Sequence, residues 1–575
     1  MSAKIETIRH SLAHIMAYAV QELYPGAKFG IGPAIENGFY YDFELSVPLA
    51  PEDLLKIEKK MRELLAQNIV FKKQKLTRTV LVRMFKKQPY KLELLKEIKQ
   101  PTIYESGTFV DLCSGPHVKS TKEITPDAFK LTKIAGAYWK GSEKNKMLTR
   151  IYGVAFAIKK ELEDFLKIQE EAEKRDHRII GKNLDLFVFS DLVGKGLPLF
   201  TEKGSIIRRE LERFVVDEEI KRGYKHVYTP ELAKVELYKT SGHYPYYKDS
   251  MYPVMKIDEE ELILRPMTCP HHFQLYASKP RSYKELPFRI AELAKQFRYE
   301  KSGELTGLIR VRSFCLADAH IICQKEKAMD EINGVLDLIE YMALKLGLKA
   351  GVNYRYRLSL GDRKDSKKYF KDNEAWNFAE GVLRNVLTKR GKDNFFEAQK
   401  EAAFYGPKID IQMKNFAGKE DTAFTIQYDF VMPKRFKLSY IDQDGKEKEP
   451  IVIHRSSIGA IERTMAFLLE HYAGALPLWL SPVQCMIIPI ADRHNQYAEK
   501  IRDELNFLRI EINNGNETVS KRIREGELQK VPYLIVVGDK EAESGKISVR
   551  ERGRGDIGAM ELSKFTEKVK MEKDA

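Results

Sequence analysis

The stretch FRYEKSGELTGLIRVRSF, residues 297–314, decides the fold that we expect for the middle of the chain. Its β-forming ends are separated by a Gly-containing loop, which predicts two strands joined by a loop. Arg298 and Glu300 would share one face of the first strand, and Arg310 would lie on the second. Paired surface charges on a hairpin are a common explanation of this pattern. The alternative is a nucleotide site, because Arg binds phosphate oxygens as a planar fork and a carboxylate can accept from an adenine amine.

A second diagnostic stretch is IVIHRSSIGAIERTMAFLLEHY, residues 451–472. It has the pattern of a short apolar strand that leads into a helix. Ser456 and Ser457 are favoured helix N-caps, so the helix is predicted to begin near Gly459 and to carry Arg463 in its first turns. An Arg on a helix is, taken alone, most often a surface residue. Long strands, hairpin loops and helices on either side predict a mixed antiparallel α+β domain.

The composition restricts the class of protein to which these segments belong. The chain has 575 residues, of which 43% are hydrophobic and 31% charged, which is typical of well-cored domains and excludes disordered, collagen-like and fibrous classes. No apolar run approaches the ~18 residues of a membrane span, and no secretory segment is seen. The 5 cysteines are scattered without a C-x-x-C pair. They indicate a reducing compartment, so we expect a cytoplasmic protein with no membrane association.

Changes in composition along the chain predict four segments. Residues 1–160 form an N-terminal domain, and the highly charged helical pattern of 161–182 is typical of a connecting helix. The middle domain covers 183–480 and ends in the Gly- and Pro-containing AGALPLWLSP. Alternating strands and helices predict an α/β domain over 481–575. The net charge of +14 favours a polyanionic partner without specifying it.

Two histidines one helical turn apart mark IRHSLAHIMAYAVQEL, residues 8–23. The apolar residues form one stripe, and His10 and His14 fall nearly opposite it, where histidines are more often exposed than functional. Zinc peptidases of the HExxH type share the spacing, but Ser11 stands where their Glu must be. Peptidase chemistry is therefore not expected.

A Cys/His pair occurs in the loop DLCSGPHV, residues 111–118. Cys113 and His117 are four positions apart in a segment rich in Gly and Pro. Together with the helix histidines they suit either a metal site or a polar catalytic cleft, and the residues themselves leave both open.

Further possible metal ligands are spread over the middle block, in MTCPHHF, LADAHIIC and VIHR. They are far apart in sequence, so spacing does not choose among them, and a buried packing element without metal is the alternative. The candidates are Cys269, His271, His272, His320 and His454.

The N-terminal motifs, together with GPAIENGFYYDF and AYWKGSEKNKMLTRIYG, resemble the editing domain of threonyl-tRNA synthetases. The resemblance implies hydrolysis of serine wrongly attached to threonine tRNA. A pocket that selects a threonine hydroxyl rejects serine, which lacks only a methyl, by about 1–3 kcal/mol, so a second site is needed. In that family the cluster positions a water and the terminal adenosine without a bound metal. The matching residues are His10, His14, Lys91, Asp111, Cys113 and His117.

The middle block resembles the antiparallel-sheet catalytic domain of class II aminoacyl-tRNA synthetases, with 297–314 as motif 2, 451–472 as motif 3 and 203–232 as motif 1. Motif 1 builds the dimer interface in that family, which implies a homodimer. The resemblance assigns Arg298 to the α-phosphate and the amino-acid carboxylate, and Arg310 to the γ-phosphate. It assigns to adenine Glu300 by hydrogen bonding, Phe314 by stacking and Arg463 on the opposite face.

Threonyl-tRNA synthetases also hold a zinc ion through one Cys and two His, which match Cys269, His320 and His454. Three protein ligands leave room for the amino and hydroxyl groups of threonine, and valine is rejected because it has no hydroxyl. By the same resemblance Asp318 receives the threonine hydroxyl, and magnesium accompanies ATP. The other residues that line the amino-acid and phosphate pocket are Tyr405, Lys408 and Gln427, with Arg298, Lys408 and Arg463 as the catalytic set.

The C-terminal block resembles the anticodon-binding domain of this synthetase subclass, with Arg524, Glu543 and Arg550 as candidate contacts. The whole resemblance implies an enzyme that joins threonine to threonine tRNA with ATP and edits seryl-tRNA. One alternative is a prolyl or seryl enzyme of the same subclass, which the N-terminal motifs and the Cys/His/His set disfavour. The other is an inactive RNA-binding paralogue, which the intact motif arginines disfavour.

Four departures from the family pattern concern details. The ubiquitin-like domain that commonly precedes the editing domain is not expected, since the histidine helix begins within ten residues of Met1. Thr268 stands where Asn is usual, Leu316 where Gln is frequent, and Thr422 where Gln often contacts ATP. These changes affect the expected binding of the carboxylate and of ATP, and they leave the reaction class unchanged.

Overall fold

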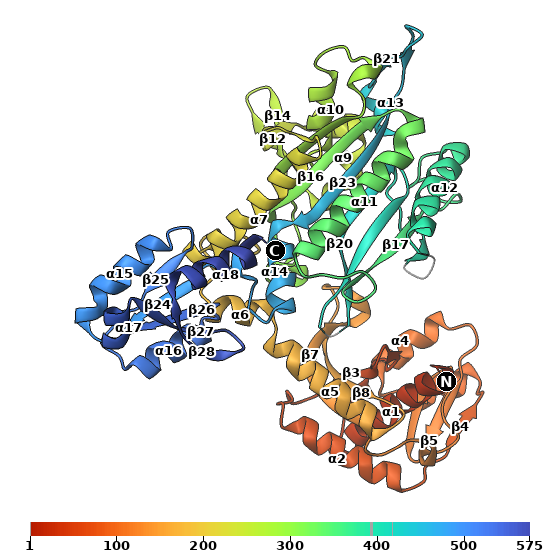
Figure 1. The fold of residues 1–575 in the computed structure, drawn as a ribbon. Helices are drawn as coiled ribbons and strands as arrows, with labels where there is room; N and C mark the ends of the chain where they lie inside the picture. Colours follow the sequence, from red (N-terminus) through yellow and green to blue (C-terminus); the bar gives the residue numbers. More distant parts are fainter. Residues whose placement is uncertain (1, 392–394, 417, 575) are drawn as a thin grey trace. The chain divides into compact units, whose positions relative to one another are not determined.

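The computed structural model describes residues 2–391, 395–416 and 418–574 (Figure 1). The chain forms two compact units, Met1–Glu170 and Glu171–Ala575, and each has its own sheets and hydrophobic cores. Among the described residues, none of the helices combines the length and the apolar character that crossing a bilayer requires. The predicted multidomain α+β class is confirmed.

The N-terminal unit is built around α1 (Ser2–Leu23), which packs against α2 (Asp53–Ala66) and a five-stranded sheet. That sheet has the order β1-β3-β8-β7 with β2 paired to β3, and a second sheet has the order β4-β5-β6. The strands of the first sheet are β1 (Lys28–Phe29), β2 (Ala34–Ile35), β3 (Gly38–Glu44), β7 (Phe129–Tyr138) and β8 (Met147–Ala155). The remaining elements are β4 (Phe71–Gln74), β5 (Ile103–Ser106), β6 (Phe109–Leu112), α3 (Arg78–Met84) and α4 (Pro89–Glu97).

Helix α1 is buried through its middle, so the alternative in which its histidines are merely exposed does not hold for His14. Every residue from 11 to 20 is buried, and His14 is only 1% exposed. At the C-terminal end of the helix, Leu23 of the apolar stripe is exposed. Both sheets of the unit and α2 surround this helix, so its polar side chains line an interior cleft.

Two helices occupy the segment expected to form one connecting helix. The first, α5, runs over Lys159–Lys174, and the second, α6, over His177–Asn183. Asp176 separates them, because its side chain accepts a hydrogen bond from the backbone N–H of Arg178 at 2.8 Å and so caps α6.

The central part of the second unit is an eight-stranded sheet, with the order β11-β15-β16-β23-β20-β19-β17-β18. All pairs are antiparallel except the outermost pairs, β11 with β15 and β17 with β18. The strands are β11 (Lys225–His226), β15 (Phe288–Phe297), β16 (Ser313–Cys323), β17 (Tyr354–Leu360), β18 (Phe395–Gln399), β19 (Lys408–Lys414), β20 (Glu420–Asp429) and β23 (Ile451–Ala460). The predicted antiparallel catalytic sheet is confirmed.

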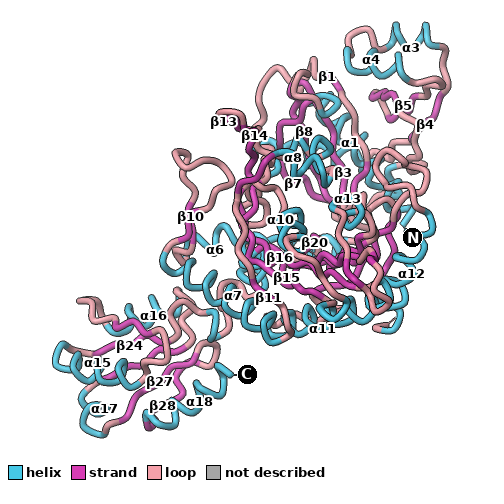
Figure 2. The backbone as a smooth tube through the Cα atoms, turned by 90° about the horizontal axis from the view of Figure 1, so that it is seen from above, coloured by secondary structure: helices cyan, strands magenta, loops and turns pink. Residues whose placement is uncertain are grey.

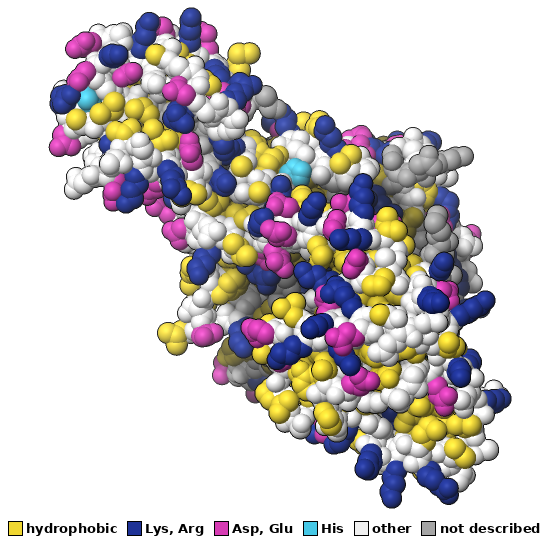
Figure 3. Space-filling model, turned by 90° about the horizontal axis from the view of Figure 1, so that it is seen from below, with side chains coloured by type: hydrophobic (Ala, Val, Ile, Leu, Met, Phe, Trp, Pro, Cys, Tyr) yellow, Lys and Arg dark blue, Asp and Glu magenta, His cyan; other side chains and the backbone are white. Residues whose placement is uncertain are grey.

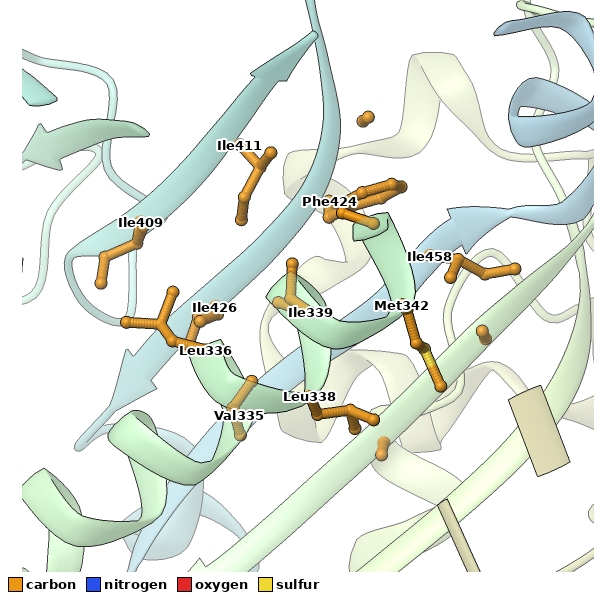
Figure 4. Packing of buried hydrophobic residues seen from close by; sticks show 14 of the residues in the cluster. Val335, Leu336, Leu338, Ile339, Met342, Ile409, Ile411, Phe424, Ile426 and Ile458 are labelled. Carbon is orange, nitrogen blue, oxygen red and sulfur yellow. The ribbon is translucent and has the colours of Figure 1, made fainter. Parts of the chain in front are cut away.

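Helices cover one face of this sheet and leave the other face for polar groups. Helix α11 (Ala328–Lys345) runs along the strands, as Figure 2 shows, and its apolar residues pack on the sheet (Figure 4). The alternation of a strand then divides β16: Ala317, Ala319 and Ile321 belong to this core, whereas Asp318 and His320 point to the opposite face. Other helices of this region are α7 (Glu202–Lys221), α8 (Val235–Ser241), α9 (His243–Tyr246), α10 (Cys269–Ala277), α12 (Asn373–Lys389), α13 (Met432–Phe436) and α14 (Ile461–His471).

Two element boundaries in the predicted motifs were wrong. Strand β23 extends to Ala460 and α14 begins at Ile461, so Ser456 and Ser457 lie within the strand and cap no helix. Their hydroxyls instead donate to the backbone oxygen of Ala317 at 2.9 Å and to Glu219 Oε1 at 2.8 Å. Pairing with β16 and burial of these hydroxyls therefore override the local capping preference.

The motif 2 strands are also shorter than predicted. Strand β15 ends at Phe297 and β16 begins at Ser313, which leaves Arg298, Glu300 and Arg310 in the connection between them. This connection stays tight, because the backbone N–H of Arg298 still donates to the oxygen of Arg312 at 3.0 Å. The charged side chains therefore lie together at the end of the strand pair.

The C-terminal part is an α/β domain with the sheet order β25-β24-β26-β27-β28. Strands β24, β25 and β26 are parallel, and β27 and β28 add antiparallel to them. The strands are β24 (Cys485–Pro489), β25 (Ile510–Ile512), β26 (Tyr533–Val537), β27 (Lys546–Glu551) and β28 (Gly555–Glu561). The helices are α15 (Asn495–Glu504), α16 (Val519–Leu528), α17 (Asp539–Ser544) and α18 (Leu562–Asp574).

Charged side chains of both signs are interspersed on the face of the molecule that Figure 3 shows. Ion pairs at the surface of the described residues include Arg384 with Glu397 at 2.6 Å. Exposed pairs of this kind contribute little to stability, on the order of 0–1 kcal/mol each.

A buried ion pair joins α7 to β23 beneath the polar face of the sheet. Arg455 Nη1 lies 2.5 Å from Glu219 Oε1, and both side chains are almost fully buried. Glu219 also accepts from Ser457 and pairs with His226 at 2.9 Å. Among the described residues no hydrogen-bond partner meets Nε or Nη2 of Arg455, so Glu219 is its main countercharge.

We expect Glu219→Ala to destabilise the second unit by about 3–5 kcal/mol, because it leaves the Arg455 charge buried without compensation. Hydrogen exchange of peptides from β16 and β23, measured on the full chain, should show a matching loss of protection. Arg384→Ala, which breaks an exposed pair in the same domain, is the control and should leave this protection unchanged. Equal protection in the two variants would contradict the role of the buried pair.

Candidate functional site

Four polar side chains form a row across neighbouring strands on the open face of the central sheet. Lys408 on β19 lies opposite Gln427 on β20, Gln427 lies opposite His454 on β23, and His454 lies opposite His320 on β16. Directly opposed residues point to the same face of a sheet, so these four side chains share one surface. The sheet register therefore brings together residues that are up to 134 positions apart, from 320 to 454.

Cys269, at the start of α10, completes a group of possible metal ligands with His320 and His454. One ligand atom from each of the three buried residues lies within 4.8 Å of the others. His454 Nε2 is paired with Asp429 Oδ2 at 2.6 Å, which leaves Nδ1 of His454 available. One thiol and two imidazoles form the donor set that zinc prefers, with space for further ligands, so these residues fit the ion.

Burial keeps the Cys269 thiol and the His320 imidazole uncharged when no cation is present. It raises the pKa of the Cys269 thiol well above its ordinary value and lowers that of His320 well below. A bound divalent cation reverses the first effect, because it stabilises the thiolate. Because the Cys269 thiol and the His320 ring are uncharged, they offer lone pairs to a cation without repelling it.

The walls of this cleft carry hydrogen-bonding groups for a small polar substrate. Asp318 lies two positions before His320 on the same face, and Gln296 Nε2 donates to its Oδ2 at 3.3 Å. Burial raises the pKa of Asp318. The ring of Tyr405 stacks on His454 with centroids 5.0 Å apart, and its hydroxyl donates to Oε1 of Gln427.

Three arginines line the adjacent end of the strand pair. Arg298 lies over the ring of Phe314 at 5.1 Å, and Arg310 Nε is 3.3 Å from Glu300 Oε2. Arg463 on α14 donates from Nε to the backbone oxygen of Ile309 at 3.0 Å. Burial, and then the nearby charge of Arg298, lowers the pKa of Arg463. So many positive groups facing one space favour a polyanionic ligand such as the phosphates of a nucleotide.

Lys408 and the departures from the family pattern are also placed by hydrogen bonds. Lys408 Nζ donates to Oδ1 of the buried Asp410 at 2.9 Å. Thr268 Oγ1 accepts from Gln296 Nε2 at 3.0 Å, and Thr422 Oγ1 accepts from Gln412 Nε2 at 2.6 Å. Leu316 is half-buried and lies opposite Ala294 and Ala460.

A separate cluster in the N-terminal unit brings together all the N-terminal candidates. Cys113 Sγ lies 3.3 Å from His10 Nε2 and 3.4 Å from His117 Nε2. His14 Nε2 lies 3.5 Å from Asp111 Oδ2, and Lys91 Nζ pairs with Asp111 Oδ1. The loop 111–118 thus closes over the buried helix α1.

Neighbouring groups fix the protons of two of these imidazoles. His10 Nδ1 lies 3.1 Å from the backbone oxygen of Pro116, which can only accept, so Nδ1 carries the proton. Ser11 Oγ donates to the oxygen of Thr7 and therefore accepts from His117 Nδ1 at 3.1 Å. Both rings then present a bare Nε2 to the thiol of Cys113.

The N-terminal cluster lines a cavity of about 800 Å³. Burial lowers the pKa of His10, His14 and His117 and raises that of Cys113 to about 11, so all four groups are neutral at pH 7. The cavity is large enough for a nucleoside with an attached amino acid, and it offers neutral imidazole and thiol groups beside the Lys91–Asp111 ion pair. Its lining includes Thr7, His10, Lys91, Asp111 and Cys113.

The three C-terminal candidates do not form one cluster. Arg524 is exposed on α16, and Glu543 is exposed on α17. Arg550 on β27 pairs with Glu527 of α16 at 3.4 Å. Two of the three therefore lie beside α16.

Several residues that support the site were missed in the sequence. Asp429, Gln296 and Tyr41 hold His454, Asp318 and Asp111 respectively, and each comes from a different strand from the residue it holds. Asp429 carried a usable signal, because it lies two positions after Gln427 on one strand face. Gln296 and Tyr41 carried no such signal in the sequence.

Three family models match the chain. The class II core domain of tRNA synthetases (G, H, P, S and T) matches residues 252–472, and an anticodon-binding domain matches residues 484–572. The second additional domain of threonyl and alanyl tRNA synthetases matches residues 102–152.

Two similar solved structures cover most of the chain. The RNA-binding domain of threonyl-tRNA synthetase from Cryptosporidium parvum has 34% identity and a TM-score of 0.65, and covers 69% of this chain and 98% of that one. A putative threonyl-tRNA synthetase from Aeropyrum pernix has 30% identity and a TM-score of 0.61, and covers 69% of this chain and 94% of that one.

Curated relatives extend the similarity to the whole chain. The threonine–tRNA ligase of Anoxybacillus flavithermus is 46% identical, over 100% of this chain and 89% of the relative. The threonine–tRNA ligase of Clostridium botulinum is 48% identical, over 98% of this chain and 88% of the relative. With its three matching domains and this level of identity over its full length, the chain belongs to the threonine–tRNA ligase family.

Proposed function

We propose that the chain activates threonine with ATP on the central sheet and transfers it to threonine tRNA. The observation that carries this proposal is the row Lys408, Gln427, His454 and His320, with Cys269 above it and the motif arginines beside it. A selective amino-acid pocket and a polyanion site thus share one sheet face, as the joining of an amino acid to a nucleotide requires.

Zinc would be held by Cys269, His320 and His454, where it would supply positively charged coordination positions for the amino and hydroxyl groups of threonine. Asp318 would accept from the threonine hydroxyl. Magnesium would accompany ATP.

The threonine carboxylate would attack the α-phosphate in line, with pyrophosphate leaving, and a ribose hydroxyl of the tRNA end would then displace AMP. Arg298 would hold the α-phosphate and the carboxylate and stabilise the charge that develops on them, and Arg463 would lie on the opposite face of the adenine. Lys408 would supply a further positive charge, oriented by Asp410. Arg310 would hold the γ-phosphate, with Glu300 and Phe314 at the adenine.

We further propose that the domains divide the work as residues 1–160 for editing, 183–480 for activation and 481–575 for the anticodon, with Arg524, Glu543 and Arg550 as contacts. A cytoplasmic homodimer is proposed from the family alone. In the editing cavity, His10, His14, Cys113 and His117 would position the water and the terminal adenosine, while Lys91 and Asp111 hold the cluster in place.

ATP–pyrophosphate exchange with single amino acids tests the activation proposal. We expect threonine to give the highest kcat/KM and serine to be about 10–200-fold lower because it lacks one methyl group. Valine should be about 10⁴-fold lower, since it leaves the groups that meet the hydroxyl unpaired. Exchange that proline drives best, or that no amino acid drives, would contradict the proposal. Arg298→Ala should lower the threonine rate about 10²–10³-fold, and the exposed control Arg384→Ala should not.

For the editing proposal, we expect His10→Ala to lengthen the lifetime of seryl-tRNA while threonine-dependent exchange is unchanged, because the two clusters lie in separately cored units. General acid–base groups typically contribute about 10²–10⁴-fold to a reaction rate. We therefore expect the deacylation rate to decrease by a factor in that range. His454→Ala is the matched control and should show the reverse pattern, with exchange lost and deacylation retained. Unchanged deacylation in His10→Ala would remove His10 from the editing site.

The pH dependence of editing follows from the lowered pKa values of the cluster histidines. An imidazole with a pKa near 6.5 loses about tenfold of its neutral form between pH 7.5 and 5.5. Because burial lowers the pKa of His10, His14 and His117, these rings stay neutral as the pH falls through 6.5. Single-turnover deacylation at pH 5.5 should therefore stay within about threefold of the rate at pH 7.5. A tenfold fall centred near 6.5 would show that an imidazole there titrates normally.

A further inference from the structure

His272 lies beside one of the three metal-binding candidates, on the same helix as another. It is fully buried on α10, three residues after Cys269. Its Nδ1 lies 2.8 Å from Nδ1 of His320, and its Nε2 lies 3.3 Å from Oε2 of Glu292. The sequence offered His272 as a possible ligand, but both of its ring nitrogens are already engaged with protein groups.

The partners of Glu292 set the direction of these hydrogen bonds. Its Oε1 accepts from Arg265 Nη2 at 2.9 Å, and its Oε2 accepts from Thr229 Oγ1 at 2.7 Å. An ionised carboxylate only accepts, and Arg265 holds Glu292 in that form. His272 therefore donates from Nε2, and in its neutral form its Nδ1 is bare.

Because Nδ1 of His272 carries no proton, the proton that lies between it and Nδ1 of His320 must belong to His320. His320 Nδ1 then donates to His272, and Nε2 of His320 keeps a free lone pair. The opposite placement would put the proton of His320 on Nε2, and that ring could not bind a cation. The chain from Arg265 through Glu292 and His272 thus selects the tautomer of His320 that can ligate.

His454 obtains the same result by a shorter route, because Asp429 accepts from its Nε2 at 2.6 Å. Partners of this kind commonly orient metal-binding histidines. His271, the neighbour of His272, has neither link: among the described residues no carboxylate or second imidazole is hydrogen-bonded to its ring nitrogens.

We propose that His272 is a positioning residue that prepares His320 to bind the metal, through the relay Arg265–Glu292–His272–His320. The inference rests on the proposed function, in which a zinc ion is held by Cys269, His320 and His454. It assigns different roles to the two adjacent histidines of the CPHH sequence, of which only His272 affects the metal.

The test measures zinc affinity of the full-length protein by competition with a chelator, after the metal has been removed and added back. We expect His272→Leu to bind zinc about 10–100-fold more weakly than the wild-type protein. His272→Asn should recover part of this loss, because its amide oxygen lies near the position of Nδ1 and can accept from His320. His271→Leu, an equally conservative change at the next position, should bind zinc as tightly as the wild-type protein.

Cobalt substitution provides a readout that general destabilisation does not imitate. The ligand-field absorption of Co²⁺ should change in His272→Leu and match the wild-type spectrum in His271→Leu. If His272→Leu does not fold, His272→Gln replaces it, because its amide is placed to reach Glu292 rather than His320, and it should bind zinc more weakly than His272→Asn.

Each outcome is decisive. Wild-type affinity and an unchanged cobalt spectrum in His272→Leu, or a His272→Gln variant that binds zinc at least as tightly as His272→Asn, would overturn the relay. Equal weakening by His271→Leu would show that packing of α10 matters and hydrogen bonding does not. A wild-type protein that takes up no zinc at all would instead overturn the proposed metal site, which distinguishes the two failures.

Discussion

The buried pair of Arg455 and Glu219 is the constraint on which the catalytic sheet depends. Arg455 and His454 are consecutive on β23, so they point to opposite faces. Anchoring Arg455 to α7 beneath the sheet therefore fixes His454 on the open face, opposite His320 and Gln427. A slip of one residue would turn His454 to the helix-covered face and Arg455 into the cleft, which would lose both the ion pair and the row of site residues.

In both sites of the chain, hydrogen bonds fix which ring nitrogen of a histidine carries the proton. In each, an acceptor on one ring nitrogen decides which lone pair the other nitrogen presents, and burial favours the neutral rings of His320 and His10. In the catalytic cleft the acceptors are Asp429 and the His272 relay, whereas in the N-terminal cavity they are Pro116 and Ser11. The catalytic cleft differs in its three neighbouring arginines, which adapt it to a nucleotide.

The sequence predicted those parts of the structure that depend on residues close together in the chain. It predicted less well the parts that depend on residues far apart in the chain. The class of the sheet and the residues of the motifs followed from local pattern and from resemblance. The caps at Ser456 and Ser457 were wrong, because pairing with a distant strand decided that segment, and the burial of His14 likewise depends on distant segments that the local pattern does not show. Asp429 carried a signal in its strand face, whereas Glu292 and Gln296 could not be assigned, since each acts on a residue of another element that only the fold places beside it, His272 of α10 and Asp318 of β16.

The separation of the two clusters follows from the chemistry of discrimination. A site that meets the threonine hydroxyl gains about 4–5 orders of magnitude against valine, but only about 1–2 against serine, because a missing methyl leaves no polar group unpaired. Better discrimination between threonine and serine in the same pocket would require tighter packing against the one methyl group, which contributes at most a few kcal/mol. A separate cavity with neutral groups and its own core avoids that limit, since its geometry can change without moving His454 or the sheet. Selection by a hydroxyl and correction by hydrolysis therefore belong on different units of the chain.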